Sequence, residues 1–562
     1  MASPLIITLL LPPILFLVFT LYSLLRNYLI ARKIGLPIII LPISPENPVW
    51  MLLAHHVVPL LQYVPFGNGN FSKFCHIGWE FEDKYHAHEE LGDAFVHVTP
   101  GKNWIYLCNA ETMHDVIRRE RQGDFGRPVE LLAMLDVFGP NLSTAQGSDW
   151  QRQRKCTAAT FNEQSNVLVW NEALRQGAQL LDYWTARGDK GTQSIAHDVK
   201  TLALDVLIHV GFGKSFDFQG YEDKVRSASQ PEAALTYRDA LGKILENAIL
   251  ILALGPNTLR RLSFIPALGR LSTAADLFKQ YMVDIFEETQ QNKQQGTRGN
   301  LLTSLARASI EDKTITPEEV YGNIFVYNFA GHDTTAHTFA FTFMLLAAYP
   351  EVQDWVCEEI NYVLQDTKSD VSTVNYDTFP RFVRTLALLH ETLRLYSPTL
   401  GIVKGTERQP ARLNIGGREI VVPPHTRVDF DTNALHSHPR YWGADSLEWK
   451  PSRWITAAPG QGPRPARESL VMPADHSYIP FSDGMRACPG KKFAQVEHVA
   501  VMVAVLQRHR VVPVRRAGED DASARSRVLR GVKEDTGMKL LLQMLRPEKS
   551  PLRVEEREAV NV

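Results

Sequence analysis

The hydrophobic and polar positions along the chain divide it into stretches of different character. Residues 4–25 are apolar and carry no charge, and this is about the length that a helix needs to cross a bilayer. Residues 95–98 and 104–107 are short apolar runs on either side of a turn-like Pro-Gly-Lys-Asn, which predicts two strands. Residues 165–315 are helical in pattern, and residues 321–349 form one long helical run.

A further helix is predicted from residue 382 onward. Its apolar side chains recur at i, i+4, i+7 and i+11, namely Phe382, Leu386, Leu389 and Leu393. This spacing is typical of one buried helix face. Glu391 and Arg394 stand three residues apart on the same helix, close enough to form an ion pair.

The N-terminal apolar run has three interpretations: a membrane anchor, a cleaved signal peptide and a buried core helix. No Lys or Arg precedes it, whereas Arg26, Arg32 and Lys33 follow it. A signal peptide has a basic start and a shorter apolar core. We therefore expect residues 1–31 to be an uncleaved, single-pass transmembrane anchor. The positive-inside rule places the rest of the chain in the cytosol.

The remaining chain is predicted to have three parts. Residues 32–67 are rich in proline, which predicts a stiff hinge that resists helix, although its second half could equally be an irregular edge of the main domain. Residues 68–545 form the main domain. Residues 546–562 are a charged tail, which we expect to be disordered.

Composition excludes several classes of protein. Of the 562 residues, 44% are hydrophobic and 22% are charged, which is ample for a globular core. The formal net charge of −2 gives no reason to expect nucleic-acid binding. The five cysteines are too few and too scattered for a disulfide framework. None shows CxxC spacing, so a zinc site is not expected.

One cysteine has neighbours at informative offsets. Cys488 stands between Gly484 and Gly490, with Arg486 two residues before it and Phe481 seven residues before it. An apolar, helix-compatible run follows directly. The glycines permit backbone turns that a Cβ would forbid, and the start of a helix favours a thiolate over a thiol. The pattern indicates a loop that presents one sulfur rather than an inert buried cysteine.

Two other stretches carry candidate chemistry. Trp150 and Arg154 lie four residues apart, so they share one helix face and could together bind a carboxylate. Residues 330–335, Ala-Gly-His-Asp-Thr-Thr, interrupt the long helical run. Gly331 leaves room for a flat group, Thr334 can bond the carbonyl one turn back, and Asp333 is a candidate proton carrier. A plain kink is the alternative interpretation.

These motifs resemble those of the cytochrome P-450 family, in the family's order and over residues 68–545. The matching stretches are Trp-x-x-x-Arg at 150–154, Ala-Gly-x-Asp-Thr-Thr at 330–335, Glu-x-x-Arg at 391–394, aromatic-x-Pro-x-Arg-aromatic at 449–454, and Phe-x-x-Gly-x-Arg-x-Cys-x-Gly at 481–490. The chain has Trp at both ends of the fourth motif, where Phe is usual. The resemblance implies a mainly α fold with a minor β portion (α+β).

The resemblance also implies roles for individual residues. Cys488 would be the thiolate ligand of the iron of haem b, shielded by Phe481 on a loop shaped by Gly484 and Gly490. The haem propionates would be held by Arg486, Trp150 and Arg154. Gly331 would lie against the haem, and Asp333 and Thr334 would relay protons to bound O2. Glu391, Arg394 and Arg453 would form an ion network that locks the cysteine loop, and Lys404 is a weaker candidate propionate partner.

The implied activity is that of a monooxygenase anchored in the endoplasmic reticulum. Its electrons would come from NADPH through an NADPH-cytochrome reductase, with a cytochrome b-type donor as an alternative. Candidate basic contacts for the reductase are Lys491, Lys492, Arg152 and Lys155. Candidate substrate-lining residues are all apolar: Phe325, Phe329, Leu400, Ile402 and Met538.

An apolar lining fits a lipophilic substrate such as a terpenoid, steroid, polyketide or fatty acid. The proline-rich stretch and the long loop before Cys488 resemble fungal members that act in secondary metabolism. Two rival functions remain: a haem-thiolate isomerase or dehydratase that does not use O2, and a non-catalytic, membrane-anchored haem protein. The Asp333-Thr334 pair argues against both, because neither needs a proton relay to O2.

Overall fold

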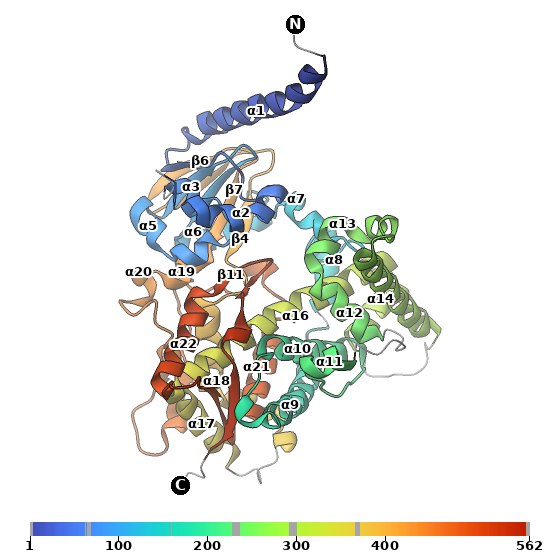
Figure 1. Ribbon diagram of the computed structural model, residues 1–562, viewed down its shortest axis with the longest axis vertical. Coiled ribbons are helices and arrows are strands. Elements are labelled where there is room, and N and C mark those ends of the chain that lie inside the picture. The colour runs from blue at the N-terminus through green and yellow to red at the C-terminus, as the bar shows by residue number, and fades with distance from the viewer. Residues whose placement is uncertain are drawn as a thin grey trace.

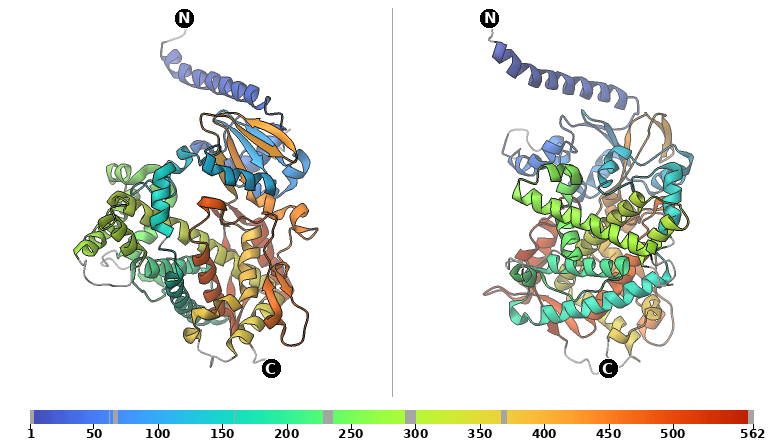
Figure 2. Two further views of the ribbon diagram at one scale, coloured as in Figure 1. Left: turned by 180° about the vertical axis from the view of Figure 1, so that it is seen from behind. Right: turned by 90° about the vertical axis from the view of Figure 1, so that its right-hand side faces the viewer.

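The molecule is a helical body with a small β sheet at one end, from which the N-terminal helix projects (Figures 1 and 2). The computed structural model describes residues 4–61, 63–64, 69–158, 160–227, 236–291, 300–365 and 371–557. Helices dominate and strands are short, so the predicted mainly α fold with a minor β portion is confirmed.

The helices that build the body share long buried faces. They include α8 (Gly147–Ala158), α9 (Glu163–Thr185), α10 (Ile195–Phe212), α12 (Tyr237–Glu246), α13 (Ala248–Arg261), α14 (Pro266–Gln291), α15 (Leu301–Ile310), α16 (Pro317–Ala348), α17 (Pro350–Leu364), α18 (Val383–Leu395), α21 (Lys491–Leu506) and α22 (Asp521–Glu534). Shorter helices lie around the sheet and beside it: α3 (Asn70–Phe74), α4 (Trp79–Asp83), α5 (His86–Leu91), α6 (Ala110–Arg119), α7 (Val129–Leu132), α19 (Thr432–Ser437) and α20 (Pro439–Trp442). A further short helix, α11 (Tyr221–Ser227), follows α10.

The main sheet has the strand order β1-β2-β3-β7-β4. Its members are β1 (Ile38–Ile40), β2 (Ala94–Val98), β3 (Asn103–Leu107), β4 (Gly401–Gly405) and β7 (Arg427–Asp431). The predicted strands at 95–98 and 104–107 correspond to the antiparallel pair β2 and β3. Two-stranded pairs complete the β portion: β5 (Ala411–Ile415) with β6 (Arg418–Val422), β8 (Ile455–Ala457) with β9 (Glu468–Leu470), β10 (His509–Pro513) with β13 (Leu552–Glu556), and β11 (Thr536–Met538) with β12 (Leu542–Met544).

The N-terminal segment begins with α1 (Pro4–Ala31), which projects away from the body (Figure 2). Its stretch Pro13–Ala31 has a mean hydropathy of 1.7 and only 6% of it is buried, so by length and composition it could cross a membrane. The C-terminal end of α1 contacts the sheet. Asn27 Nδ2 donates to the Thr99 carbonyl at 2.8 Å, and Asn103 Nδ2 donates to the Asn27 carbonyl at 2.9 Å.

The predicted hinge at 32–67 is wrong over most of its described length. β1 pairs in parallel with β2, and the Ile39 side chain is 3% exposed. α2 (Pro48–Leu61) follows, so proline did not prevent a helix. Pro48 occupies the first turn, where a missing N–H costs nothing. The predicted boundary between residues 67 and 68 lies outside the described residues.

The predicted disorder of the tail at 546–562 is also wrong as far as residue 557. β13 pairs antiparallel with β10 from His509↔Glu556 to Pro513↔Leu552. Leu552 is buried, and Leu552 and Val554 point to the same face because strand side chains alternate. The high charge of the tail concealed this short alternation. Residues 558–562 lie outside the described part of the chain.

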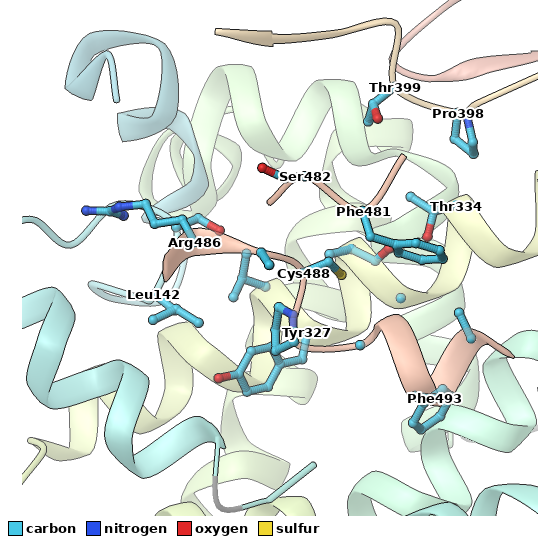
Figure 3. A pocket seen from close by; sticks show the side chains of 18 of the residues that line it. Leu142, Tyr327, Thr334, Pro398, Thr399, Phe481, Ser482, Arg486, Cys488 and Phe493 are labelled. Atoms are coloured by element: carbon cyan, nitrogen blue, oxygen red, sulfur yellow. The ribbon is translucent and has the colours of Figure 1, made fainter. Parts of the chain in front are cut away.

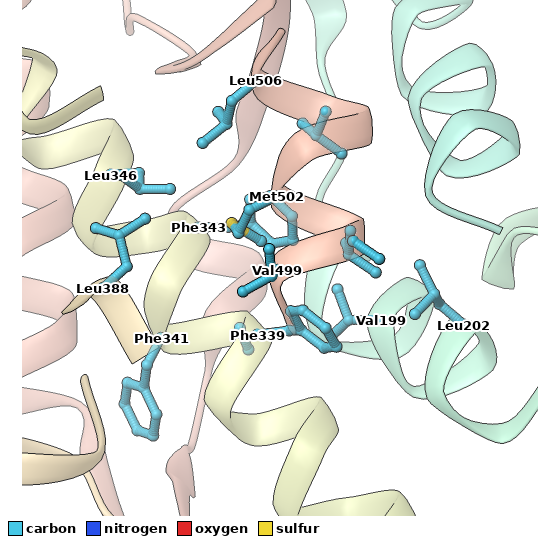
Figure 4. Packing of buried hydrophobic residues seen from close by; sticks show 14 of the residues in the cluster. Val199, Leu202, Phe339, Phe341, Phe343, Leu346, Leu388, Val499, Met502 and Leu506 are labelled. Carbon is cyan, nitrogen blue, oxygen red and sulfur yellow. The ribbon is translucent and has the colours of Figure 1, made fainter. Parts of the chain in front are cut away.

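The core that supports the site lies where α21 packs against α9 and α16 (Figure 4). Val499, Met502 and Leu506 of α21 meet Phe339 and Phe343 of α16, with α10 beyond them. α16 begins at a capping box in which Thr316 and Glu319 exchange hydrogen bonds. The helix is buried along most of its length, which fixes α16 opposite the loop that precedes α21.

Candidate active site

A cavity of about 630 Å³ lies between α16 and the loop that leads into α21. Cys488, Phe481 and Thr334 line it, together with Trp150, Arg154, Arg486 and Gly331. Figure 3 shows the Cys488 side chain close to Phe481, Tyr327 and Thr334. The structure therefore brings most of the predicted site residues to one cavity, although they come from distant parts of the chain.

The cysteine loop is held by its own backbone. The Cys488 N–H donates to the Phe481 carbonyl at 2.8 Å, which closes the turn that presents the sulfur. Gly484 has φ +67°, and a Cβ there would lie 2.5 Å from Ile117 Cγ2. Gly484 is therefore required both by the turn and by the close approach of α6.

Gly490 differs from its prediction. Its φ of −84° and ψ of 7° are accessible to any residue, so no turn requires a glycine there. A Cβ at this position would instead lie 3.9 Å from Cys488 Sγ. The glycine leaves the space beside the sulfur open.

The ionisation of Cys488 also differs from the expectation. Burial raises the pKa of the thiol, and the Gly490 backbone amide with the positive charges of Arg154 and Arg127 only partly opposes this. The start of α21 alone does not produce a thiolate. A bound metal ion would, because a coordinating thiol loses its proton to the metal.

Arg486 is the centre of a buried charge cluster next to the cavity. Its guanidinium stacks over the Trp150 ring at 4.6 Å and pairs with Glu120 at 3.0 Å. Glu120 also pairs with Lys404 Nζ at 2.7 Å. Lys404, the weaker candidate propionate partner, thus shares Glu120 with Arg486, and it is not among the described residues that line the cavity.

Arg127 is a cavity residue that the sequence did not predict. It lies in the loop before α7, and burial lowers the pKa of its guanidinium. With Arg154 and Arg486 it brings three guanidinium groups to the lining of one cavity. Nothing in its local sequence marks it, because a lone Arg in a loop is usually a solvated side chain.

The two predicted relay residues face different sides of α16. Thr334 lines the cavity, and its Oγ1 donates to the Ala330 carbonyl at 2.6 Å, which is the predicted bond one turn back. Asp333 is not among the described residues that line the cavity. Its carboxylate pairs with Lys200 Nζ of α10 at 2.9 Å and with His332 Nδ1 at 3.2 Å.

The environment of Asp333 keeps its carboxylate ionised. Burial alone would raise the pKa, but the hydrogen bond from His332 and the positive charge of Lys200 outweigh it, so the pKa lies well below its ordinary value. Lys200 is 133 residues upstream of Asp333, and nothing in the local sequence of either residue marks this pairing.

Gly331 makes room for a neighbouring side chain. A Cβ there would lie 3.1 Å from Leu207 Cδ2 of α10. The glycine lines the cavity, but the space it leaves is directed at Leu207, so close packing of α16 against α10 explains it better than a flat ligand does.

The predicted ion network behind the cysteine loop is present. Glu391 accepts hydrogen bonds from Arg394 Nε and Nη2, both at 2.8 Å, and from Arg453 Nε at 2.9 Å. The Trp454 indole also donates to Glu391 at 2.9 Å. Trp in place of the usual Phe thus adds a hydrogen bond to the network.

The predicted substrate-lining residues are mostly wrong. Ile402 lines the cavity, whereas the other four are not among its described lining residues. Phe325 and Phe329 stack on each other in a separate hydrophobic cluster, Leu400 is buried in the main core, and Met538 packs against Gly78. Val326, Tyr327 and Ala330 of α16 line the cavity instead, on the same side of the helix as Gly331 and Thr334.

The donor set fits haem. Iron takes a thiolate as an axial ligand, and guanidinium groups bind carboxylates such as the propionates in a bidentate manner. One thiol and three arginines around a single cavity supply both. Fold and site together define the class of haem-thiolate proteins.

Comparisons with known proteins agree with this class. The model of the family Cytochrome P450 matches residues 61–536. Cytochrome P450 monooxygenase ORF6 of Penicillium roqueforti is 30% identical over 530 residues, which cover 88% of this chain and 90% of that protein. The phomenoic acid biosynthesis cluster cytochrome P450 monooxygenase of Leptosphaeria maculans is 27% identical over 90% of this chain and 92% of that protein.

A crystal structure of a cytochrome P450, CYP102L1, aligns with a TM-score of 0.64 at 18% identity and covers 85% of this chain and 98% of that one. At this identity the likeness concerns the fold alone. The family match and the curated relatives show that the chain belongs to the cytochrome P450 family. It is a monooxygenase of that family, which implies haem with a thiolate iron ligand.

Proposed function

We propose that this protein is a monooxygenase of the endoplasmic reticulum membrane that oxidises a lipophilic small molecule in fungal secondary metabolism. One observation carries the proposal: Cys488 and Thr334, from the loop before α21 and from α16, line the same cavity. A ligand for iron and a hydroxyl that can deliver protons thereby face one reaction space.

Cys488 Sγ is the proposed iron ligand. Arg127, Arg154 and Arg486 are the proposed propionate partners, with Trp150 supporting Arg486 from beneath. When bound, haem with a thiolate ligand activates O2 for insertion of one oxygen atom into the substrate. The guanidinium groups of the buried Arg486 and the half-buried Arg127 and Arg154 would orient the cofactor, because a planar fork fixes both the position and the tilt of a carboxylate.

Thr334 and Asp333 are the proposed proton donors to this reaction. Thr334 Oγ1 is the hydroxyl at the cavity, and the Ala330 carbonyl orients it. Asp333 lies behind it and is held ionised by Lys200 and His332. The Asp333 carboxylate would accept a proton from the Lys200 ammonium, rotate toward Thr334 and pass the proton on, after which Lys200 would regain a proton from the α10 side of α16.

The substrate is proposed to be lipophilic. The cavity lining is largely apolar and includes Leu207, Val210, Val326 and Ile402. An apolar pocket retains a ligand mainly by burying its carbon surface. A relative from the phomenoic acid biosynthesis cluster supports a product of secondary metabolism, and terpenoids, steroids, polyketides and fatty acids are the candidate classes.

The membrane location is supported by α1 and by exposed apolar side chains on α2 and at the bend between α13 and α14. Phe264 at the bend between α13 and α14 is 78% exposed, and Val49 of α2 is 64% exposed. Exposed apolar side chains at these positions are consistent with contact with a membrane. A proposed NADPH-dependent reductase supplies electrons; of its predicted contacts, Arg152 is engaged with Glu319 at 2.7 Å, which leaves Lys155 and Lys491 as better candidates.

The test of the iron ligand is the absorption spectrum of the reduced, CO-bound protein in membranes. We expect the red-shifted Soret band of thiolate-ligated iron in the wild type and its loss in Cys488→Ser. Cys156→Ser is the matched control, because Cys156 is half-buried and not part of the described cavity lining. A wild-type band without the red shift would refute the assignment.

The test of the activity is turnover with NADPH, a microsomal reductase and O2. Spectral shifts across a panel of terpenoids, steroids, polyketides and fatty acids would first identify binders. Hydroxylated product that depends on NADPH supports a monooxygenase. Conversion of a bound lipophile without NADPH would instead support an isomerase or dehydratase.

A further inference from the structure

We propose that His114, His476 and Asp483 form a binding site for a divalent cation of the zinc type, separate from the proposed haem site. The three residues come from α6, from the loop before the cysteine loop, and from the cysteine loop itself. One ligand atom of each lies within 4.8 Å of the other two.

The spacing of two of the ligands already suits a metal ion. His114 Nδ1 lies 3.5 Å from Asp483 Oδ2. In a tetrahedral zinc site with metal–ligand bonds of about 2.1 Å, neighbouring ligand atoms are about 3.4 Å apart. An ion placed between these two atoms would therefore need little movement of either side chain.

The backbone fixes the carboxylate in this position. Asp483 Oδ1 accepts a hydrogen bond from the Gly484 N–H at 2.7 Å, so the second oxygen, Oδ2, is directed toward His114. Gly484 in turn packs against Ile117 of α6. The close packing of α6 on the loop thus sets the distance between imidazole and carboxylate.

The two imidazoles of the cluster stack face to face. Their ring centroids are 3.6 Å apart and their planes are within 10° of parallel. His114 Nδ1 is buried and has no hydrogen-bond partner among the described residues. Because the lone pairs of parallel rings do not converge on one point, binding requires the exposed His476 ring to turn out of the stack toward an ion held between His114 and Asp483.

The chemistry of the ligands selects the ion. Two imidazoles and one carboxylate suit zinc, which accepts nitrogen and oxygen ligands in four-coordinate sites. Three protein ligands leave the fourth position to water. His114 and Asp483 are 28% and 41% exposed, so the ion can exchange with solution.

The sequence did not reveal this site, because its ligands are up to 369 residues apart (114 to 483). Residues so far apart form no short motif of the kind by which a zinc site is recognised in a sequence. The consequence of binding is a link between α6 and the cysteine loop. A ligand that binds only the folded state stabilises it by mass action, so zinc should stabilise this loop against opening.

The test is a zinc titration of the full-length, haem-loaded protein by isothermal calorimetry, with zinc K-edge X-ray absorption to identify the ligands. The wild type should bind one zinc ion with imidazole scattering. His476→Asn and Asp483→Asn should each weaken binding about tenfold or more, which is the scale of a lost ligand or ligand support.

These variants keep the local backbone. His476 has φ +59°, which Asn tolerates, and Asn at position 483 can still cap Gly484. His425→Asn is the matched control, because His425 is an exposed histidine with φ +58° far from the cluster in sequence, and it should bind zinc like the wild type. A normal CO spectrum shows that each variant retains its haem site.

Wild-type affinity in His476→Asn or Asp483→Asn would overturn the proposal, as would an absorption spectrum without imidazole scattering. Equal loss of binding in His425→Asn would also overturn it, because the cluster would then not be the site. The proposal is independent of the proposed substrate and electron donor, so failed turnover would leave it unaffected.

Discussion

Replacement of Glu391 by Gln tests the ion network behind the cysteine loop. The carboxylate is completely buried and accepts hydrogen bonds from Arg394, Arg453, the Trp454 indole and the Lys450 backbone. Gln has nearly the same volume, so the change removes the charge without creating a cavity. It also turns an acceptor into an N–H donor that faces the donors around it.

The magnitude follows from what Glu391→Gln leaves behind. The Arg394 side chain is 0% exposed, and its other acceptors are the neutral carbonyls of His436, Ser446 and Glu448. Removing one partner of a buried ion pair costs about 3–5 kcal/mol. Because folded proteins are stable by only about 5–15 kcal/mol, this is a large part of the total.

Urea unfolding of the haem-loaded protein, followed by far-UV circular dichroism and by the CO spectrum, measures the loss of free energy. Glu419→Gln is the matched control, because Glu419 is 60% exposed and pairs with Arg412, which is 72% exposed. Such a surface pair contributes about 0–1 kcal/mol.

A loss below about 1 kcal/mol in Glu391→Gln, equal to the control, would refute the reasoning, because it would mean that the buried cation is not destabilised by losing its partner. Where Glu391→Gln does not accumulate, Arg453→Lys supplies the measurement. Lysine keeps the charge but loses the planar fork, so it should cost about 1–3 kcal/mol.

Three further changes probe the cavity side of the molecule. Thr334→Ala should raise the peroxide released per NADPH consumed, whereas Thr338→Ala, one turn further along the lining, should not. Equal peroxide release per NADPH in the two variants would contradict a role of Thr334 in proton delivery. Lys200→Met should destabilise the fold at neutral pH by about 1.5–3 kcal/mol. Since the pKa of Asp333 is depressed in the folded state, this stabilisation is present above the unfolded value of about 3.9 and is lost as the pH falls through the folded value. The loss of unfolding free energy that Lys200→Met causes, measured by urea unfolding, should therefore shrink toward acid pH. In an Asp333→Asn background this loss should be absent at any pH. Glu120→Gln removes a carboxylate that competes with the haem propionates for Arg486 and Lys404. The variant should therefore hold haem more tightly and transfer it to apomyoglobin more slowly than the wild type does. Faster transfer would contradict this competition.

The sequence predicted those parts of the structure that local pattern and motif spacing determine. The strands at 95–98 and 104–107, the long α16 and the Glu391 network all follow from periodicity or from a short motif. The cysteine loop was identified for the same reason, because its residues stand at fixed offsets. The roles of its individual residues remain predictions until they are measured.

The residues that the sequence missed act through distant partners. Arg127 reaches the cavity from a loop without a motif, and Lys200 reaches Asp333 across the interface between α10 and α16. Neither pairing leaves a local signal. The side of α16 that lines the cavity was also misjudged at Phe325, because this helix is buried almost all round and hydrophobicity does not distinguish its faces.

The contact between α1 and the sheet has a practical consequence for shortened forms of the enzyme. Asn27 exchanges hydrogen bonds with the loop and strand at Thr99 and Asn103, and Ala31 is buried against the sheet. A truncation after Ala31, at the end of α1, would remove these hydrogen-bond partners from the edge of the domain and expose the surface that Ala31 covers. A truncation just before Asn27 would remove the apolar part of α1 but keep the Asn27 hydrogen bonds and the buried Ala31. The domain and its β1 edge should then stay intact.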